Sequence, residues 1–375
     1  MNASKLAALA VFLLADDAAL QQRLQHALDQ VREERGFPGA VLGVAQADGT
    51  SFALATGVSD REKGTAMTTD LLLLQGSIGK TYVAATALQL VKEGKLDLDS
   101  KIATLLSGEA WLSRLPNVQE ITVRMLMNHT SGLVRYEFQE AFTRDLSAHP
   151  EKTWRPAELV AYVLDSPAPF PAGTKWEYSD TNYIVLGLVV EKVTGAKLAD
   201  EIDRRLLRPL ELAHTVPSDR RRIPGLSQGY AGEGNPFGGV DAMLREGEMA
   251  INPQFEWAGG GYASTAEDLA RWIRAFHSGT VVDRELLEKA REGVPAPMLG
   301  KDVRYGLGVI VLETPVGPAY GHSGFFPGYC AEAYWFPELG AAMALQINSS
   351  DVGKMKGSPR AMLLRLAQVH RRKPD

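Results

Sequence analysis

The chain has 375 residues, of which 45% are hydrophobic and 23% are charged, close to the average soluble globular protein. This composition excludes a disordered chain. The formal net charge is −5, whereas nucleic-acid-binding proteins usually carry an excess of basic residues. No nucleic-acid partner is therefore expected. The single cysteine, Cys330, excludes an internal disulfide and a cysteine-based metal cluster.

The N-terminus allows two interpretations. Lys5 precedes the apolar run Leu6 to Leu14, which has the shape of a signal-peptide core. Asp16 and Asp17 follow where a cleavage site needs small residues, which favours an N-terminal helix instead. Residues 1–17 are therefore either a signal remnant or part of a helix, and the predicted location is periplasmic or secreted, with cytoplasmic as the alternative. The run is too short for a membrane span, which needs about 20 residues, and no integral membrane span is predicted.

The N-terminal part is predicted to form a helix followed by a hairpin and a second helix. Apolar residues recur at helical spacing between Ala18 and Glu34. Two apolar runs, residues 39–47 and 50–58, flank the turn signal Asp48-Gly49. The next helix is predicted over residues 78–93.

The middle of the chain reads as mostly helical. Shorter helices are predicted at residues 123–128, 157–165, 181–194 and 198–207. Residues 224–261 are rich in glycine and proline and are predicted to form loops. Ser264 with Glu267 has the pattern of a capping box, which would start a helix that runs to His277.

The C-terminal part is predicted to turn to strands before a last helix at about residues 359–370. The strands are predicted at residues 305–313, 319–322, 329–336 and 341–348. Strands at both ends of the chain predict an α+β fold in which one antiparallel sheet is built from both termini and flanked by helices. The predicted α/β domain is discontinuous, over 18–70 and 290–375, and a mainly helical domain, 71–289, is inserted into it.

Ser77 and Lys80 form the first candidate catalytic pair. A helix that begins near Ser77 would place both side chains on one face, because residues three apart are neighbours there. A buried lysine beside apolar or cationic groups loses its proton easily and could act as general base for the serine. Ser-x-x-Lys also occurs by chance in chains of this size.

Tyr178 and His322 are the other two candidates. Tyr178 precedes a predicted helix and could relay protons, although a tyrosine bonded to backbone is the ordinary alternative. His322 closes a predicted strand, and Gly324 beside it would leave room for a substrate backbone. Unperturbed histidine titrates near neutral pH, so His322 is expected to change charge there and to donate a hydrogen bond to substrate or to Tyr178. The same His-Ser-Gly triplet occurs at His277. There it is explained by the predicted end of a helix, where histidine and glycine are common.

Two other features of the sequence have to be compared with these candidates, namely a second serine motif and the histidines. Gly225 to Gly229 matches the Gly-x-Ser-x-Gly nucleophile elbow around Ser227, but no buried strand precedes it and a glycine-rich loop follows. The motif therefore reads as a surface loop. The seven histidines include no pair at metal-ligand spacing, and neither a metal nor another cofactor is predicted.

In combination these motifs resemble the serine hydrolases of the class C β-lactamase and D,D-peptidase superfamily. The order Ser77-x-x-Lys80, Tyr178 and His322 matches the family, and further matching blocks lie at residues 128–133, 171–187, 259–269 and 305–308. The resemblance covers roughly residues 20–350. It implies the β-lactamase/transpeptidase-like fold, with the active site between the sheet and the inserted helical domain.

The resemblance also implies a role for each residue. Ser77 would be the acylated nucleophile, while Lys80 and Tyr178 would handle protons. His322 stands where β-lactamases usually carry lysine, which is more similar to D,D-peptidases, D-aminopeptidases and related esterases. The backbone N–H groups of Ser77 and Phe325 would form the oxyanion hole.

Three further residues are predicted to support substrate binding. Ser323 and Gly324 follow His322 directly. Asp180 stands where many members carry asparagine, and an ionised aspartate can only accept hydrogen bonds. It would either attract a cationic group of the substrate or pair with Lys80 and support the site.

The predicted function is hydrolysis of small amide or ester substrates through an acyl-enzyme on Ser77. D-amino-acid peptides are the first substrate class, as for a D,D-carboxypeptidase or a D-aminopeptidase. Carboxylesterase and β-lactamase activities are the alternatives, since they share the acylation chemistry. A non-catalytic binding or scaffolding protein is the second alternative. The partner would be a small peptide, ester or β-lactam, and the sequence does not indicate an oligomeric state.

Overall fold

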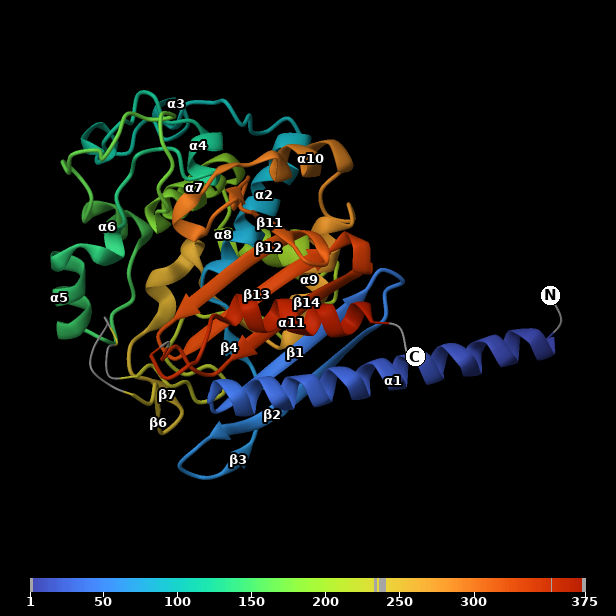
Figure 1. Cartoon of the computed structure of the whole chain (residues 1–375). Coiled ribbons are helices and arrows are strands. Elements are labelled where there is room, and N and C mark those ends of the chain that lie inside the picture. Colours follow the sequence, from blue (N-terminus) through green and yellow to red (C-terminus); the bar gives the residue numbers. More distant parts are fainter. Residues whose placement is uncertain (1–2, 233–234, 236–240, 352, 373–375) are drawn as a thin grey trace.

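The computed structural model describes residues 3–232, 235, 241–351 and 353–372 (Figure 1). Its first element, α1 (Ala3–Arg35), extends the predicted N-terminal helix back through the described part of residues 1–17. Figure 1 shows that the beginning of α1 projects away from the rest of the chain. Within the described residues no helix is both long enough and apolar enough to cross a bilayer.

A nine-stranded antiparallel sheet combines both ends of the chain, as predicted. Its order is β3-β2-β1-β14-β13-β12-β11-β10-β9, so N-terminal β1 lies directly beside C-terminal β14. The strands from the N-terminal end are β1 (Gly39–Gln46), β2 (Ser51–Asp60) and β3 (Thr65–Ala66). The strands from the C-terminal end are β9 (Val294–Pro295), β10 (Arg304–Tyr305), β11 (Ile310–Thr314), β12 (Gly317–Phe326), β13 (Tyr329–Phe336) and β14 (Ala341–Ile347).

Helices cover both faces of this sheet, which explains why its central strands β13 and β14 are buried along their whole length. On one face Leu42 of β1 belongs to the apolar core that includes residues of α1 and of α11 (Pro359–Arg371). On the other face Val41 belongs to the core shared with α9 (Ala266–His277). Successive side chains of a strand point to opposite faces, so a fully buried strand carries no polar alternation.

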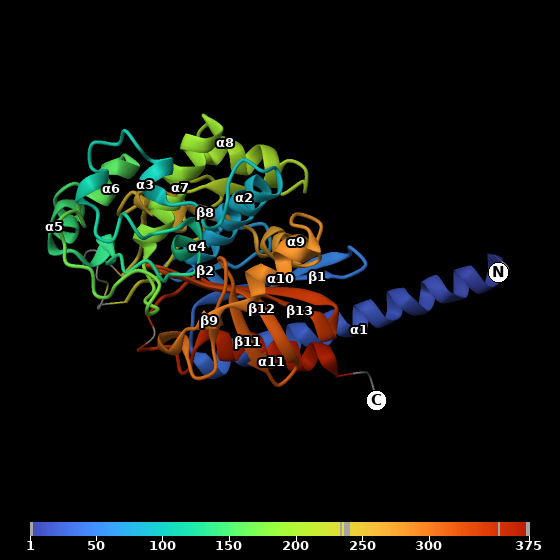
Figure 2. The ribbon, with the colours of Figure 1, turned by 90° about the horizontal axis from the view of Figure 1, so that it is seen from above.

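The remaining helices and short strands lie mainly between β3 and α9 in the sequence and gather beside the sheet (Figure 2). The helices are α2 (Lys80–Lys92), α3 (Ile102–Leu105), α4 (Val123–Met127), α5 (Glu140–Ala148), α6 (Pro156–Ala161), α7 (Asp180–Thr194), α8 (Leu198–Ile202) and α10 (Arg284–Glu292). A small three-stranded sheet has the order β4-β8-β5, from β4 (Leu73–Leu74), β8 (Tyr262–Ser264) and β5 (Thr215–Pro217). A separate hairpin pairs β6 (Leu244–Arg245) with β7 (Glu248–Met249).

Several local predictions differ from the structure. The predicted strand 305–313 is divided into β10 and β11, because Gly306 to Val309 form a turn stabilised by the hydrogen bond from Gly306 N to Val309 O. Thr265 rather than Ser264 caps α9, since its side chain accepts from Asp268 N. The sequence analysis predicts no helix at the positions of α3, α5 and α10. The α9 helix packs on the sheet although it lies inside the range predicted for the helical domain, and the domain boundaries stay a prediction.

The contact between β1 and α9 leads to a stability prediction. A Cβ at Gly43 would overlap the carbonyl oxygen of Ala266, the first residue of α9. Gly43→Ala therefore forces α9 away from the sheet and lowers the free energy of unfolding by about 1–3 kcal/mol. Gly353→Ala is the control, because a Cβ there meets nothing closer than 3.4 Å. Urea denaturation of both variants measures the difference, and equal midpoints would contradict the tight contact.

Candidate active site

Ser77 lies on a short 3₁₀ turn, Gly76–Gly79, that leads directly into α2. Lys80 is the first residue of α2, one turn after Ser77. Its Nζ lies 2.9 Å from Ser77 Oγ, so the structure brings together the pair expected from the sequence. The turn begins just after β4, which places Ser77 at the end of a buried segment.

Two glycines allow the Ser77 turn to pack tightly on β12. A Cβ at Gly324 would overlap the carbonyl oxygen of Gln75, and a Cβ at Gly76 would overlap the backbone of Phe325. Gly76 also has φ 51°, a conformation that other residues rarely adopt. The space beside Gly324 is therefore filled by the nucleophile turn, and the expectation that a substrate backbone occupies it is corrected.

Lys80 is held by three acceptors and is fully buried. Besides Ser77 Oγ, its ammonium donates to the carbonyl oxygen of Gly259 and, at 2.5 Å, to Oδ1 of Asp180. Burial favours the neutral amine, yet the negative charge of Asp180 outweighs it and raises the pKa of Lys80 above its usual value. Lys80 is therefore an ammonium in the resting site, whereas the sequence analysis expected a lysine that loses its proton easily.

Asp180 uses both of its carboxylate oxygens for cations of the chain. Oδ1 binds Lys80, and Oδ2 accepts from Arg135 at 2.7 Å. Burial favours the neutral acid, but Lys80 and Arg135 hold the pKa of Asp180 well below its usual range. Of the two interpretations of Asp180, the structure shows pairing with Lys80, and a second cation of the chain, Arg135, occupies the other oxygen.

Tyr178 presents a hydroxyl that the described chain does not use. Its oxygen is buried and has no hydrogen-bond partner among the described residues. Burial raises the pKa of Tyr178 to about 12, while the neighbouring Lys80 and Ser77 act in the opposite direction. The hydroxyl is thus protonated at neutral pH, lies close to the Ser77–Lys80 pair, and is available to a reacting group.

His322 is a neutral histidine whose two ring nitrogens are both engaged. Nδ1 lies 2.6 Å from the carbonyl oxygen of Ser323, which can only accept, so Nδ1 carries the proton. Nε2 then accepts from the hydroxyl of Tyr305 at 2.8 Å. Burial, reinforced by the charge of Lys80, lowers the pKa of His322 to about 3. The expectation that His322 changes charge near neutral pH is therefore wrong.

Ser323 faces away from the nucleophile. Side chains alternate along a strand, and its neighbour Gly324 faces the Ser77 turn. The Ser323 hydroxyl donates to Glu332 at 2.8 Å and accepts from Arg360 of α11 at 3.1 Å. This network ties β12 to the C-terminal helix, so the hydroxyl is not directed at a substrate.

Phe325 lies at an edge of β12 that its neighbouring strand leaves open. Strand β11 pairs with β12 only as far as Gly321, and Gly76 packs against the Phe325 backbone beyond that point. The Phe325 side chain is 45% exposed beside the Ser77 turn. The backbone of this residue therefore borders the nucleophile, as expected for one side of an oxyanion hole.

Several residues of the site were not singled out from the sequence. His129 stacks on Tyr178 with ring centroids 4.2 Å apart, and its Nδ1 accepts from the backbone N–H of Ser179. Arg135 and Glu256 belong to the charged cluster around Asp180. The matching block at residues 128–133 contains His129, which was the available signal for that residue, whereas Arg135 and Glu256 lie outside the matching blocks.

The rival serine lies outside the site. Ser227 is buried rather than on the surface, which corrects the surface-loop expectation. Among the described residues its hydroxyl donates to backbone carbonyls alone, those of Gln228 at 3.2 Å and Ser59 at 3.5 Å, and no base contacts it there. Within the described ranges, no group of three or more histidine, cysteine, aspartate or glutamate side chains could hold a metal ion.

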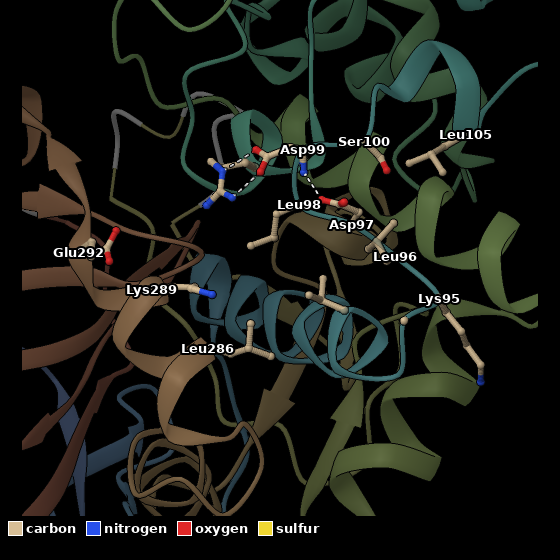
Figure 3. Close-up of a pocket in the computed structure, with 13 residues that line it drawn as sticks. Lys95, Leu96, Asp97, Leu98, Asp99, Ser100, Leu105, Leu286, Lys289 and Glu292 are labelled. Atoms are coloured by element: carbon tan, nitrogen blue, oxygen red, sulfur yellow. Dashed lines mark hydrogen bonds and ion pairs between the residues drawn. The ribbon is translucent and has the colours of Figure 1, made fainter.

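A large groove also lies outside the site. It has a volume of about 810 Å³ and is bordered by the loop after α2 and by α10 (Figure 3). Arg124 and Asp99, which are paired at 2.8 Å, both line it. Leu98 and Leu286 also line it (Figure 3). None of the catalytic candidates lines this groove.

Comparisons with known proteins agree with this geometry. The chain is 30% identical to penicillin-binding protein 4 of Amycolatopsis lactamdurans, over 86% of this chain and 84% of that protein. It is 29% identical to esterase EstB of Burkholderia gladioli, over 83% of this chain and 88% of the esterase. The crystal structure of a D-stereospecific amidohydrolase from Streptomyces sp. superposes with a TM-score of 0.75 at 29% identity, over 90% of this chain and 96% of that one.

The fold is also that of the D-amino acid amidase from Ochrobactrum anthropi SV3, with a TM-score of 0.80 over 94% of this chain and 98% of the amidase, at 24% identity. The family model described as Beta-lactamase matches residues 21–367, which include every catalytic candidate named above. With Ser77, Lys80, Tyr178 and His322 gathered at one site on this fold, the chain belongs to the Beta-lactamase family.

Proposed function

We propose that this protein is a serine hydrolase that cleaves small amide or ester substrates through an acyl-enzyme on Ser77. The observation that carries the proposal is the distance of 2.9 Å between Lys80 Nζ and Ser77 Oγ, beside the unpartnered hydroxyl of Tyr178. A scaffolding protein would need neither a buried lysine on its serine nor an open tyrosine hydroxyl. The same arrangement supplies a nucleophile, a fixed cation and a proton carrier.

Proton transfer in acylation runs through Tyr178. All three N–H bonds of the Lys80 ammonium are taken, and one of them donates to Ser77 Oγ, so the serine proton must leave in another direction. As Ser77 Oγ attacks the carbonyl carbon, its proton passes to the Tyr178 oxygen, and the tyrosine proton passes to the leaving amine or alcohol. Water reverses these transfers in deacylation and releases the acid product.

Lys80 contributes a fixed positive charge to this reaction. It stabilises negative charge that develops on the Ser77 and Tyr178 oxygens, and Asp180 keeps the lysine in place. The backbone N–H groups of Ser77 and Phe325 are the proposed oxyanion hole. Removal of one such donor from an enzyme typically costs about 2.7–4 kcal/mol in the transition state.

Short D-amino-acid peptides and amides are the proposed substrate class. The Streptomyces relative is a D-stereospecific amidohydrolase, and the Amycolatopsis relative is a penicillin-binding protein. The second candidate is a carboxylesterase, favoured by the similarity to EstB. The proposed location is the periplasm or outside the cell, and the proposed domains are 18–70 with 290–375, and 71–289.

Replacement of the nucleophile gives the first test of this function. Ser77→Ala is expected to abolish hydrolysis of p-nitrophenyl acetate, of D-alanyl p-nitroanilide and of nitrocefin, because no acyl-enzyme can form. It is also expected to abolish labelling by a fluorophosphonate, read by intact mass. The control is Ser227→Ala, whose hydroxyl bonds only to backbone, and this variant should react as the wild type. The opposite pattern would assign the nucleophile to Ser227.

Substitution of Lys80 tests the fixed cation. Lys80→Arg is expected to slow acylation nearly as much as Lys80→Ala. The Lys80 side chain is fully buried, and a planar guanidinium in its place cannot reproduce the three contacts of the ammonium. Stopped-flow acylation by nitrocefin or a p-nitrophenyl ester measures both variants. An arginine variant with most of the wild-type rate would show that positive charge alone is sufficient.

The protonation state of His322 can be measured directly. Since its folded pKa of about 3 lies below the ordinary value, the ring should stay neutral, with the proton on Nδ1, from pH 8 to pH 5. Folded-state stability that depends on the neutral ring is present above the unfolded pKa of about 6.5 and is lost as the pH falls toward 3. ¹⁵N chemical shifts of labelled histidine, assigned with His322→Asn, report the state, and a midpoint between pH 6 and 7 would contradict it.

A further inference from the structure

Glu332 is a buried carboxyl group to which the proposed mechanism gives no role. It lies on β13 directly opposite Ser323 of β12, and it is 6% exposed. Directly opposed residues of an antiparallel pair place their side chains on the same face of the sheet. Cys330 and Tyr334, which share this face, pack in the same core as α11 (Figure 1). Glu332 and Ser323 therefore meet between the sheet and the C-terminal helix.

Ser323 links this carboxyl group to the catalytic segment of β12. Its hydroxyl donates to Glu332 Oε2 at 2.8 Å, while its carbonyl oxygen accepts from His322 Nδ1 at 2.6 Å. Two residues further along the strand, the backbone of Phe325 packs against Gly76 of the nucleophile turn. Because these residues belong to one strand, the position of the Ser323 side chain affects both the histidine and the proposed oxyanion donor.

Arg360 of α11 holds the same hydroxyl from another direction. Its Nη2 donates to Ser323 Oγ at 3.1 Å, and its Nε lies 3.8 Å from Glu332 Oε2. Its Nη1 donates to the carbonyl oxygen of Leu299 at 3.0 Å, which fixes the guanidinium. The hydroxyl of Tyr334 lies 3.1 Å from Ser323 Oγ. Three side chains from two elements, β13 and α11, therefore fix the Ser323 hydroxyl.

The charge of Glu332 determines how strong these contacts are. Burial raises the pKa of Glu332 to about 7, whereas Arg360 and the Ser323 hydroxyl act in the opposite direction. Above this pH the carboxylate accepts a charge-assisted hydrogen bond, which is stronger than a bond to a neutral acid. Below it the neutral carboxyl group no longer balances the guanidinium, so Ser323 is held less firmly.

The groups that face Glu332 keep their own charge near neutral pH. Burial raises the pKa of Cys330 to about 12 and also raises that of Tyr334, so both stay protonated. Leu345 of β14, directly opposite Glu332 on its other side, has no charge. Arg360 is the cation that α11 contributes, and a guanidinium stays charged at every working pH. Glu332 is therefore the group that changes its charge in this network.

We propose that Glu332 and Arg360 are positioning residues for acylation, because through Ser323 they keep β12 in place against the nucleophile turn. This inference rests on the proposed acyl-enzyme function and goes beyond it, since it makes the rate depend on groups outside the site. Both residues act through the strand and contribute no atom to the reaction. The C-terminal helix thus takes part in acylation, and the rate follows the ionisation of a carboxyl group.

The test is the pH dependence of acylation, measured as kcat/KM for p-nitrophenyl acetate on both sides of the Glu332 pKa of about 7. The wild-type rate should rise with pH through an inflection near this value, because the ionised carboxylate holds Ser323 best. Glu332→Gln is a neutral isostere of the acid form and should lack the inflection. Its rate should stay about 2- to 30-fold below the high-pH wild-type rate, the difference between a charged and a neutral hydrogen bond.

Two further variants test the link itself. Arg360→Gln removes the cation that lowers the pKa of Glu332, so the inflection should move to higher pH. Ser323→Ala removes the hydroxyl between the carboxyl group and the strand, so the inflection should disappear although Glu332 remains. A residue that only stabilises the fold would change neither the shape nor the midpoint of the profile. These variants also test the proposal if Glu332→Gln does not fold.

Matched variants provide the controls. Arg365→Gln removes another arginine of α11, which pairs with the exposed Glu34, and should leave the inflection in place. Glu137→Gln and Glu256→Gln remove the two carboxyl groups of the site whose pKa values are raised by burial, and the inflection should persist in both. Fluorophosphonate labelling of Ser77 counts the folded active sites, so that rates are compared per active site.

The failure of this inference and of the proposed function give different results. An inflection that survives in Glu332→Gln or Ser323→Ala, or that Arg360→Gln leaves unshifted, would overturn the positioning role. A wild-type profile without an inflection, or one whose inflection is lost in a control variant instead, would do the same. All of these results keep the hydrolase, because Ser77 is labelled and the ester is cleaved. A wild type that shows neither labelling nor hydrolysis would refute the proposed function itself.

Discussion

The ion pair between Lys80 and Asp180 is the interaction on which the rest of the site depends. A buried ammonium needs its full set of acceptors, and a buried carboxylate needs cations, so each residue fixes the position of the other. Their pairing connects the start of α2 to the start of α7, two helices that come from distant parts of the sequence. Because the pair holds Lys80 as a cation, the proton of Ser77 needs another acceptor, and this requirement gives Tyr178 its role.

Tyr178 can act as that acceptor only if its ring is fixed, and the surrounding aromatic residues do this. His129 stacks on it at 4.2 Å, while Tyr305 lies edge-on with ring centroids 5.9 Å apart. Tyr305 also binds His322, so the histidine joins the site through a hydrogen-bond chain. A neutral histidine fits this environment, because a second cation near Lys80 would oppose the protonation of the lysine. His322 therefore positions the Tyr305 ring as a neutral residue. It does not act as a charged group that contacts the substrate.

Hydrophobic patterning and turn signals predicted most of the fold. The Asp48-Gly49 hairpin, the buried strands β13 and β14, and the helices α2 and α7 lie where their residues indicate, since these signals are local. Ser77, Lys80, Tyr178 and His322 were found because they occur in short motifs. Protonation states were not predictable, because they depend on partners such as Asp180, which lies 100 residues from Lys80. The sequence likewise does not predict that β1 pairs with β14, or that Gly324 packs against the backbone of Gln75, because these contacts join distant residues.

The charges around Asp180 show the same limit of sequence analysis, because they too depend on residues that are distant in the sequence. No matching block contains Arg135 or Glu137, and their place in the site becomes clear only when the charges of the folded chain are compared. Asp180 binds both Lys80 and Arg135, and Glu137 also contacts Arg135 at 2.7 Å. Because one buried carboxylate serves two cations, loss of Asp180 would leave both Lys80 and Arg135 without their shared partner, which makes this residue the centre of the charges of the site.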